Sequence, residues 1–228
     1  MNRKEIQMSR MWRYFVDATA EIIEEEGIKN VTARKIAEKA GYTSSTIYNY
    51  FGDLSQLIFF ASMRFINEYI QEVTSFMEQG ETYLEKYILS WECFCRYSFK
   101  QPDIYHAIFI ADLGETPKSL LEKYYAVYSD ELIGIPDEIR MLLLEHNLTK
   151  RNKAFLEKSF KEKFQGNGFP PEMVEEINEV FILIWQGTMS AIMNKRVDYE
   201  IEKVAEKTIK YMRSILEAKI ALAIQPNE

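Results

Sequence analysis

The sequence predicts an all-α fold, in which an N-terminal three-helix helix-turn-helix domain precedes a larger helical domain. Apolar residues recur at helical spacing along nearly the whole chain, and no strand-like alternation persists. The 228 residues include only 9 glycines and 6 prolines, whereas 47% are hydrophobic. Long runs rich in Glu, Lys, Leu, Ile and Met favour helix, and the apolar content is ample for a buried core.

Glycines bound the first two predicted helices. An apolar stripe at helical spacing predicts a helix over residues 9–26, and Gly27 is placed to end it as a left-handed cap. Thr32 can accept a backbone N–H and so start the next helix, over residues 33–40. Gly41 ends that helix after two turns.

The third predicted helix is short and polar. Thr43 or Ser44 caps it, and Ile47 forms its buried side. Asp53 can cap a fourth helix, whose apolar pattern covers residues 54–77 and connects to the rest of the chain.

The remaining chain also has helical patterning. Helices are expected over residues 82–99, 102–111, 117–133, 138–148, 171–196 and 199–223. A charged stretch runs to Phe164, and the segment GNGFPP at 166–171 is the clearest break in the pattern. We therefore place two domains at residues 1–53 and 54–228.

Three residues carry the prediction of a helix-turn-helix. Where two short helices cross closely, a small residue is needed, and Ala37 supplies it. The tight turn favours glycine, which is Gly41, and the second helix needs an apolar anchor, which is Ile47. The combination at this spacing indicates a helix-turn-helix more strongly than any one of the three residues.

The exposed face of the third helix has the chemistry of a DNA contact surface. Asn49 can form a bidentate pair with adenine, and Arg34 can reach a phosphate or a guanine. Tyrosine hydroxyls can donate to phosphates, and short hydroxyl side chains can approach phosphates or base edges. The hydroxyl residues of this face are Ser44, Ser45, Thr46, Tyr48 and Tyr50. A merely solvated helix surface is the alternative, and the helix-turn-helix context favours DNA.

Residues 27–61, with the helix before them, resemble the TetR family of bacterial transcriptional regulators. The match to the pattern Thr-x-x-x-Ile-Ala-x-x-Ala-Gly consists of Thr32, Ile36, Ala37, Ala40 and Gly41. The match to the Ile-Tyr-x-Tyr-Phe ending consists of Ile47, Tyr48, Tyr50 and Phe51. The remaining two-thirds of the chain is similar in helical layout and length alone.

The resemblance implies a homodimer that places two recognition helices in successive major grooves of a palindromic operator. It also implies repression that a small ligand relieves. By position, Thr32 corresponds to a phosphate contact and Arg34 to a residue that contacts bases in some members. The recognition helix and its edge comprise Thr43, Ser44, Ser45, Thr46, Tyr48, Asn49 and Tyr50.

One departure from the family pattern concerns the phosphate contacts. The family often has a lysine just after the Tyr-Phe pair, whereas this chain has Gly52, Asp53 and Leu54. Either the basic N-terminal arm compensates for the missing lysine, or the affinity for DNA is modest.

Two further surfaces are expected in the larger domain. Apolar stripes on the last two helices predict a four-helix dimer interface, with the alternative that both stripes pack within one subunit. Its residues are Val180, Ile184, Ile192, Val204, Thr208, Tyr211 and Ile215. The abundance of aromatic residues suggests a site for a small apolar or aromatic ligand of unknown identity, although each residue could equally fill the core. The candidates are Met63, Trp91, Phe94, Phe109, Tyr124, Tyr128, Trp185 and Met189.

Other classes of function find no support in the sequence. There is no glycine-rich phosphate loop, nucleophile elbow or Cys/His metal spacing, so we expect no enzyme, catalytic residue, cofactor or metal site. Cys93 and Cys95 point apart on a helix and suit two buried reduced thiols. Without a signal sequence or membrane span, a cytoplasmic location is expected. A helical interaction protein with the same fold, acting through a protein partner, remains the alternative function.

Overall fold

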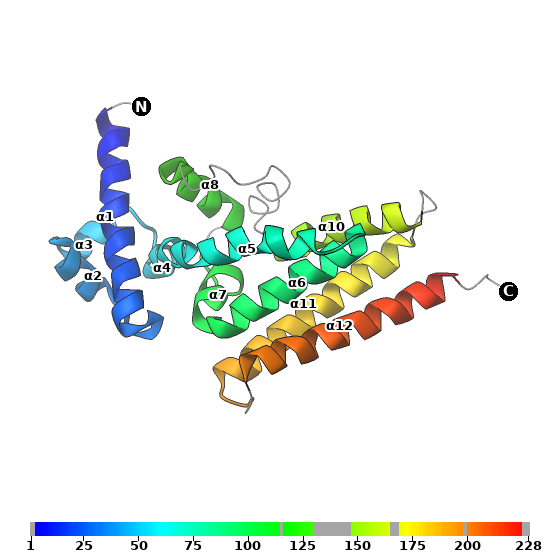
Figure 1. The fold of residues 1–228 in the computed structure, drawn as a ribbon. Coiled ribbons are helices and arrows are strands. Elements are labelled where there is room, and N and C mark those ends of the chain that lie inside the picture. Colours follow the sequence, from blue (N-terminus) through cyan, green and yellow to red (C-terminus); the bar gives the residue numbers. More distant parts are fainter. Residues whose placement is uncertain (1–2, 115, 130–146, 165–168, 198–199, 225–228) are drawn as a thin grey trace. The chain divides into compact units, whose positions relative to one another are not determined.

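The computed structural model describes residues 3–114, 116–129, 147–164, 169–197 and 200–224, and within these ranges every regular element is a helix (Figure 1). The all-α prediction is therefore confirmed. Contacts divide the chain into two compact units. The first comprises residues 1–67 and 103–146, and the second comprises residues 68–102 and 147–228. The proposed functional boundary after residue 53 stays a prediction, because this division is based on packing.

The first unit begins with a long helix against which two short helices pack. Helix α1 (Arg3–Glu26) is followed by the short η1 (Ile28–Asn30), α2 (Ala33–Ala40) and α3 (Ser44–Ile47). The core between them contains Phe15, Ile36 and Ile47, each fully buried. The α1 helix starts six residues before the predicted position, because an apolar stripe reveals only the buried part of a helix. Ile6 and Met8 of the additional turns are exposed.

Two of the predicted boundaries differ in detail. Gly27 has a φ of 85° but a ψ of 153°, so it ends α1 at positive φ without the left-handed helical conformation that we expected. The third helix ends at Ile47 rather than near Phe51. The following turn is tighter, with Asn49 N–H donating to Thr46 O and Tyr50 N–H donating to Ile47 O, three residues back in each case.

The predicted helix over residues 54–77 is interrupted. It comprises α4 (Leu54–Ser62), a 3₁₀ segment η2 (Met63–Ile66) and α5 (Asn67–Glu78). Side chains three residues apart eclipse in a 3₁₀ helix, and here that arrangement buries Met63 and Ile66 together, each 3% exposed. A periodicity search cannot distinguish such a short change of winding from a continuous α-helix.

A later segment completes the first unit. Helices α7 (Pro102–Phe109) and α8 (Pro117–Val127) both begin at proline, as predicted. The Arg13 guanidinium of α1 donates to Val127 O at 2.6 Å, and the Gln56 amide donates to Leu113 O at 3.2 Å. Residues 103–129 are thus attached to α1 and α4 by specific hydrogen bonds.

The second unit consists mainly of long helices (Figure 1). Its core contains aromatic side chains, among them Trp91, Phe181 and Trp185. After α5 come α6 (Tyr83–Lys100), α10 (Leu148–Lys163), α11 (Pro171–Met193) and α12 (Ile201–Ile224). Helix α6 contacts α10, α11 and α12. Thr82 and Glu85 form a capping box at the start of α6, and the Trp185 indole donates to Ser98 Oγ at 2.9 Å.

Two expectations for the middle of the chain need comment. The charged stretch that runs to Phe164 forms α10, and Arg151 of this helix is only 8% exposed, so one side of α10 faces the core. The helix predicted over residues 138–148 lies almost wholly outside the described residues. Cys93 and Cys95 are buried free thiols, as expected.

Candidate nucleic-acid interface

The turn between α2 and α3 has the geometry that the sequence predicted. The Thr32 hydroxyl accepts from the Lys35 N–H at 3.3 Å and so caps α2. Gly41 ends α2 in the left-handed conformation, with φ 76° and ψ 31°. Ala37 and Ile47 are 3% and 0% exposed, and α2 packs against α3. The small residue, the glycine turn and the apolar anchor therefore act together to fix the angle between two helices.

The predicted DNA-contacting residues of α3 and its edges differ in how far their side chains are exposed to solvent. The four exposed residues are Thr43, Ser45, Tyr48 and Asn49. The three half-buried residues are Ser44, Thr46 and Tyr50. The Tyr50 ring lies 6.1 Å from the Phe15 ring, so this side chain supports the core as well as the surface. The exposed set is the part that a duplex could contact without rearrangement.

Thr43 does not act as the predicted side-chain cap of α3. It occupies the N-cap position, but its hydroxyl makes no bond to a backbone N–H of the helix. Instead, Thr43 Oγ1 lies 2.9 Å from both Ser45 Oγ and Thr46 Oγ1. These three hydroxyls form a small network that orders the polar surface at the start of α3.

The start of α2 offers a second contact point for a phosphate. Thr32 and Arg34 are both exposed there, at a helix N-terminus whose N–H groups and dipole favour an anion. Arg34 makes no ion pair within the described residues. Its guanidinium is therefore available to pair with a DNA phosphate or a guanine.

The other basic residues near the turn are largely neutralised. Lys35 pairs with Glu26 at 2.5 Å, and Lys39 lies 2.8 Å from Glu25 and 3.2 Å from Glu21. Hydrogen bonds from Lys39 to Glu25 and then Glu21 raise the pKa of that lysine. The acidic end of α1 thus holds α2 in place but reduces the positive field around the turn. Phosphate contacts must depend on the remaining cations.

Tyr42 was missed by the sequence analysis. It lies in the turn just after Gly41, is 42% exposed, and its ring is 5.5 Å from the Phe15 ring. Its position next to the turn glycine is a signal that could have placed it with the candidate contact residues.

Comparison with known proteins supports this interface. Residues 15–59 match the family model described as bacterial regulatory proteins, tetR family. This match begins within α1 and ends within α4, so it includes both helices of the turn. Over residues 15–59 the chain is therefore similar to the TetR family.

Similarity over the rest of the chain is more distant. An HTH-type transcriptional regulator of Staphylococcus aureus (strain bovine RF122 / ET3-1), SAB2452, is 23% identical over 49% of the chain. The chain spans 57% of the length of that relative. Thermus thermophilus FadR, a TetR-family repressor solved with lauroyl-CoA, has a TM-score of 0.54 at 14% identity, covering 95% of this chain and 96% of its own. Bacillus subtilis FadR, solved with stearoyl-CoA, has a TM-score of 0.50 at 16% identity, with coverages of 88% and 97%.

The candidate ligand residues of this chain fall in both units. Met63, Phe109, Tyr124 and Tyr128 belong to the first unit, and Trp91, Phe94, Trp185 and Met189 belong to the second. All are buried except Phe109, which is half-buried. In the first unit, Tyr124 stacks on Phe60 at 6.3 Å and on Tyr128 at 4.7 Å. In the second, the Phe94 and Trp185 rings are 5.1 Å apart.

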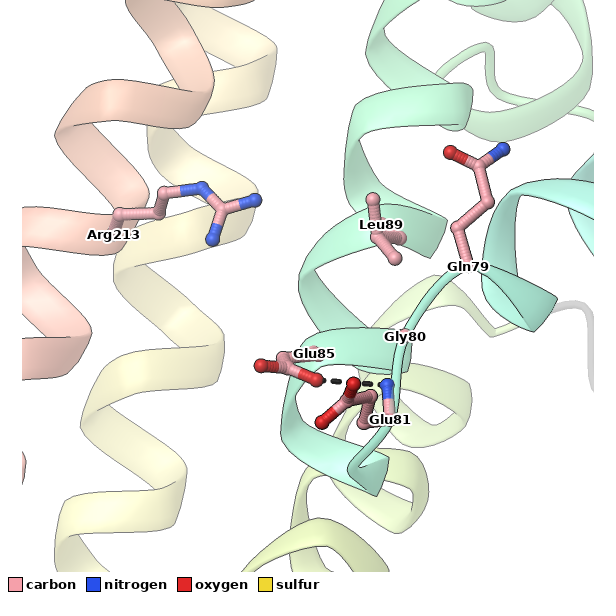
Figure 2. Close-up of a pocket in the computed structure, with 6 residues that line it drawn as sticks. All are labelled: Gln79, Gly80, Glu81, Glu85, Leu89 and Arg213. Atoms are coloured by element: carbon pink, nitrogen blue, oxygen red, sulfur yellow. Dashed lines mark hydrogen bonds between the residues drawn. The ribbon is translucent and has the colours of Figure 1, made fainter.

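An open pocket of about 340 Å³ occurs in the second unit (Figure 2). Its lining consists of Gln79, Gly80, Glu81, Glu85, Leu89 and Arg213, and includes none of the candidate ligand residues. Glu85 accepts the Glu81 N–H at 2.8 Å, so its carboxylate already serves the cap of α6. This polar opening does not have the chemistry of the expected apolar ligand site.

The candidate dimer residues also differ in exposure. Val204 and Thr208 are 4% and 3% exposed within a single chain. Tyr211 is 49% exposed, and the half-buried members are Val180, Ile184, Ile192 and Ile215. Leu183 was not predicted and is 65% exposed, and Leu222, which belongs to the expected apolar stripe of the last helix, is 54% exposed.

Proposed function

We propose that the chain is a DNA-binding transcriptional repressor of the TetR type, which binds a palindromic operator as a homodimer. The observation that carries the proposal is the exposed polar group of Ser45, Tyr48 and Asn49, held outward by the buried Ile47. Side chains of these types can contact phosphates and base edges of a major groove. The comparisons give no support to the alternative of a protein-partner module, and the proposal assigns no catalytic role to any residue.

Selection of bound duplexes from a random pool tests the proposal directly. A two-fold symmetric protein should enrich a palindrome whose half-site centres are about 34 Å or a multiple of that apart. The selection should be done at low ionic strength, because few unpaired cations surround the turn and phosphate binding weakens with salt. Enrichment of no sequence, with no retention of any duplex, would contradict the proposal.

Homodimerisation has support from two apolar strips on neighbouring helices of the second unit. The strip on α11 consists of Val180, Leu183, Ile184, Gly187 and Ala191, and the strip on α12 consists of Tyr211, Ile215, Ala218 and Leu222. Spacings of three, four and seven residues place each strip on one face of its helix. Leu183 is 65% exposed, and a face of this kind suits a two-fold helical interface.

We also propose that a small ligand releases the DNA by changing the segment from α4 to α5. The chain passes from the first unit to the second at residues 67–68, directly after the 3₁₀ segment Met63–Ile66. A short 3₁₀ stretch within a helical run often marks a hinge. Structures of the dimer with and without ligand should differ in the separation of the two α3 helices. Equal separations would contradict this mechanism.

The effector class can be tested in the same system. An apolar or aromatic molecule is the expectation from the aromatic composition, and acyl-CoA thioesters form a second class because the two FadR proteins were solved with them. Lauroyl-CoA, stearoyl-CoA and a set of apolar aromatic compounds should be compared by thermal shift and by release of the selected duplex. The effective class should raise the melting temperature and release DNA.

A further inference from the structure

The core of the second unit contains an aromatic cluster that joins three helices. Its members are Tyr87 and Trp91 of α6, Phe155 of α10 and Phe181 of α11. The Phe181 ring lies 6.0 Å from the Tyr87 ring and 5.9 Å from the Trp91 ring, and the Phe155 ring is 5.5 Å from the Tyr87 ring. All four side chains are buried. Such a cluster ordinarily fills a core, but this one also carries polar atoms.

Two of the rings bring hydrogen-bonding atoms into the interior. The Tyr87 hydroxyl and the Trp91 indole N–H find no hydrogen-bond partner among the described residues, although the two side chains are 0% and 2% exposed. Burial raises the pKa of Tyr87, and the nearby Trp91 N–H offsets part of that rise without reaching hydrogen-bond geometry. The two polar atoms therefore lie close to each other in a region that is otherwise aromatic.

Two asparagines add further polar atoms from the neighbouring helices. Asn152 and Asn178 precede Phe155 and Phe181 by three residues, so each shares a helix face with its phenylalanine. They are 7% and 1% exposed, and Asn152 Nδ2 and Asn178 Oδ1 have no hydrogen-bond partner in the described part of the chain. Asn178 is fixed in place, because its Nδ2 donates to Thr149 O at 2.9 Å.

Buried polar atoms without partners are rare, because each loses its bonds to water on folding. Four of them on the facing helices α6, α10 and α11 form a concentrated set of unused hydrogen-bonding capacity. Other such atoms, for example Ser62 Oγ, occur elsewhere among the described residues, and these four are distinguished by lying on three helices that contact one another. A bound molecule that supplies the missing partners explains why selection would retain these atoms.

We propose that Tyr87, Trp91, Asn152 and Asn178 form the binding site of a flat aromatic ligand that carries a hydrogen-bond acceptor such as a ring carbonyl. Three of the four groups can donate a hydrogen bond, so the ligand must chiefly offer hydrogen-bond acceptors. A carbonyl oxygen has two lone pairs and can accept from the Tyr87 hydroxyl and the Trp91 N–H together. The Phe155 and Phe181 rings offer faces and edges for its aromatic part. The role of this ligand as effector rests on the proposed function, whereas its binding does not.

Fluorenone and fluorene form a matched pair of probes for this site. They have the same flat tricyclic shape, but fluorenone has a carbonyl group where fluorene has a methylene group. Equilibrium dialysis with the full-length protein should give a dissociation constant about tenfold lower for fluorenone, because one or two hydrogen bonds are added. Equal affinities, or no binding of either probe, would overturn the proposal.

Two conservative variants test the named atoms. Tyr87→Phe and Trp91→Phe each remove a donor and keep an aromatic ring, so each should weaken fluorenone binding about threefold to tenfold and leave fluorene binding unchanged. Neither loses a hydrogen bond in the free protein, so Tyr87→Phe should leave the melting temperature unchanged or raise it. Tyr83→Phe, the same substitution near the start of α6, is the control and should change neither affinity.

The same variants distinguish a ligand site from a site for ordered water. If water alone satisfies these atoms, Tyr87→Phe should lower the melting temperature of the free protein and leave the fluorenone affinity as it was, which would overturn the proposal. Retention of the selected operator duplex should be measured for every variant. If the protein binds the operator duplex but not fluorenone, the result refutes this ligand site alone. If the wild-type protein binds no duplex, the result refutes the proposed function.

Discussion

At the scale of single residues, the exposed polar group beside α3 contains one side chain suited to identifying a base. Asn49 is exposed, lies in the turn just after α3, and makes no side-chain hydrogen bond within the described residues. An unengaged amide of this kind has a donor and an acceptor ready for the adenine edge. The neighbouring Thr46 is half-buried and already bonded to Thr43, so it is less available.

Asn49→Ala should weaken operator binding by about 1–3 kcal/mol and relax selectivity at one or two operator positions. The measurement is a titration of the selected duplex and of its single-base variants. Gln71→Ala, an exposed residue of α5, is a control that should have no effect. Equal weakening of binding to all duplexes would instead indicate that Asn49 contacts a phosphate rather than a base.

A second residue-scale prediction concerns the cap of α4. Asp53 accepts from the Ser55 N–H at 2.6 Å and from the Gln56 N–H at 3.2 Å. Burial raises the pKa of Asp53, but the hydrogen bonds from Ser55 and Gln56 together outweigh it and leave the pKa lowered. Asp53→Ala should therefore reduce the free energy of unfolding by about 1 kcal/mol at neutral pH, measured by urea denaturation.

The pH dependence of that cap follows from the lowered pKa. A carboxylate with a lowered folded-state pKa contributes stability above the unfolded pKa, about 4, and loses it as the pH falls through the folded value. Asp53→Asn keeps a capping oxygen but cannot titrate. As the pH is lowered from about 5 to about 1–3, the free energy of unfolding of this variant should therefore fall less than that of the wild type. Parallel stability profiles for the two proteins would show that Asp53 is not linked to folding.

At the scale of elements, the angle between α2 and α3 depends on one backbone conformation. Gly41 has a φ of 76°, which L-residues with side chains adopt at a cost. An added Cβ would meet no atom within 4 Å, so steric overlap is not a factor. The cost of a side chain at this position therefore comes from the backbone alone.

Gly41→Ala should lower the free energy of unfolding by about 1 kcal/mol, and operator binding should weaken because the turn sets the position of α3. Gly41→Asn is the matched control, because it also adds a side chain at this position but asparagine adopts positive φ more readily than alanine. That substitution should lower the free energy of unfolding by less than Gly41→Ala does. An equal effect of the two substitutions on unfolding would contradict the argument from φ.

At the scale of the whole molecule, the proposed recognition of a palindromic operator depends on a two-fold symmetric dimer. Leu183 lies in the α11 strip and Tyr211 begins the α12 strip, and they are 65% and 49% exposed. A dimer that covers them removes apolar surface from water, which is the main favourable term in such an association. Within one chain much of the surface of these two side chains stays in contact with water.

Leu183→Glu should raise the dimer dissociation constant at least about tenfold, because it places an unpaired charge in the proposed interface. Gln71→Glu, an exposed residue of α5, adds the same charge on a helix that carries neither strip and should leave the dimer intact. Sedimentation equilibrium measures both, and operator affinity should fall with the loss of dimer. An unchanged mass for Leu183→Glu would show that this face is not the interface.

Much of the helix-turn-helix could be predicted because its signals are local. Thr32 and Asp53 cap their helices with groups two or three residues away, and Gly41 acts through its own backbone. The interrupted helix at Met63–Ile66 could not be predicted in the same way, because its winding depends on which side chains the neighbouring helices bury. The candidate contact residues were identified by type and position, but their exposure was not.

The sequence by itself determined the helical class, the order of the helices and the helix-turn-helix with its caps, because propensity, periodicity and capping act over a few residues. Tertiary structure decided which polar groups are buried and which apolar groups remain exposed. Asn178 lies in the core and Leu183 at the surface, although only four residues separate them. The physical reason is that burial depends on contacts between segments far apart in the chain, such as Asn178 with Thr149 or Arg13 with Val127.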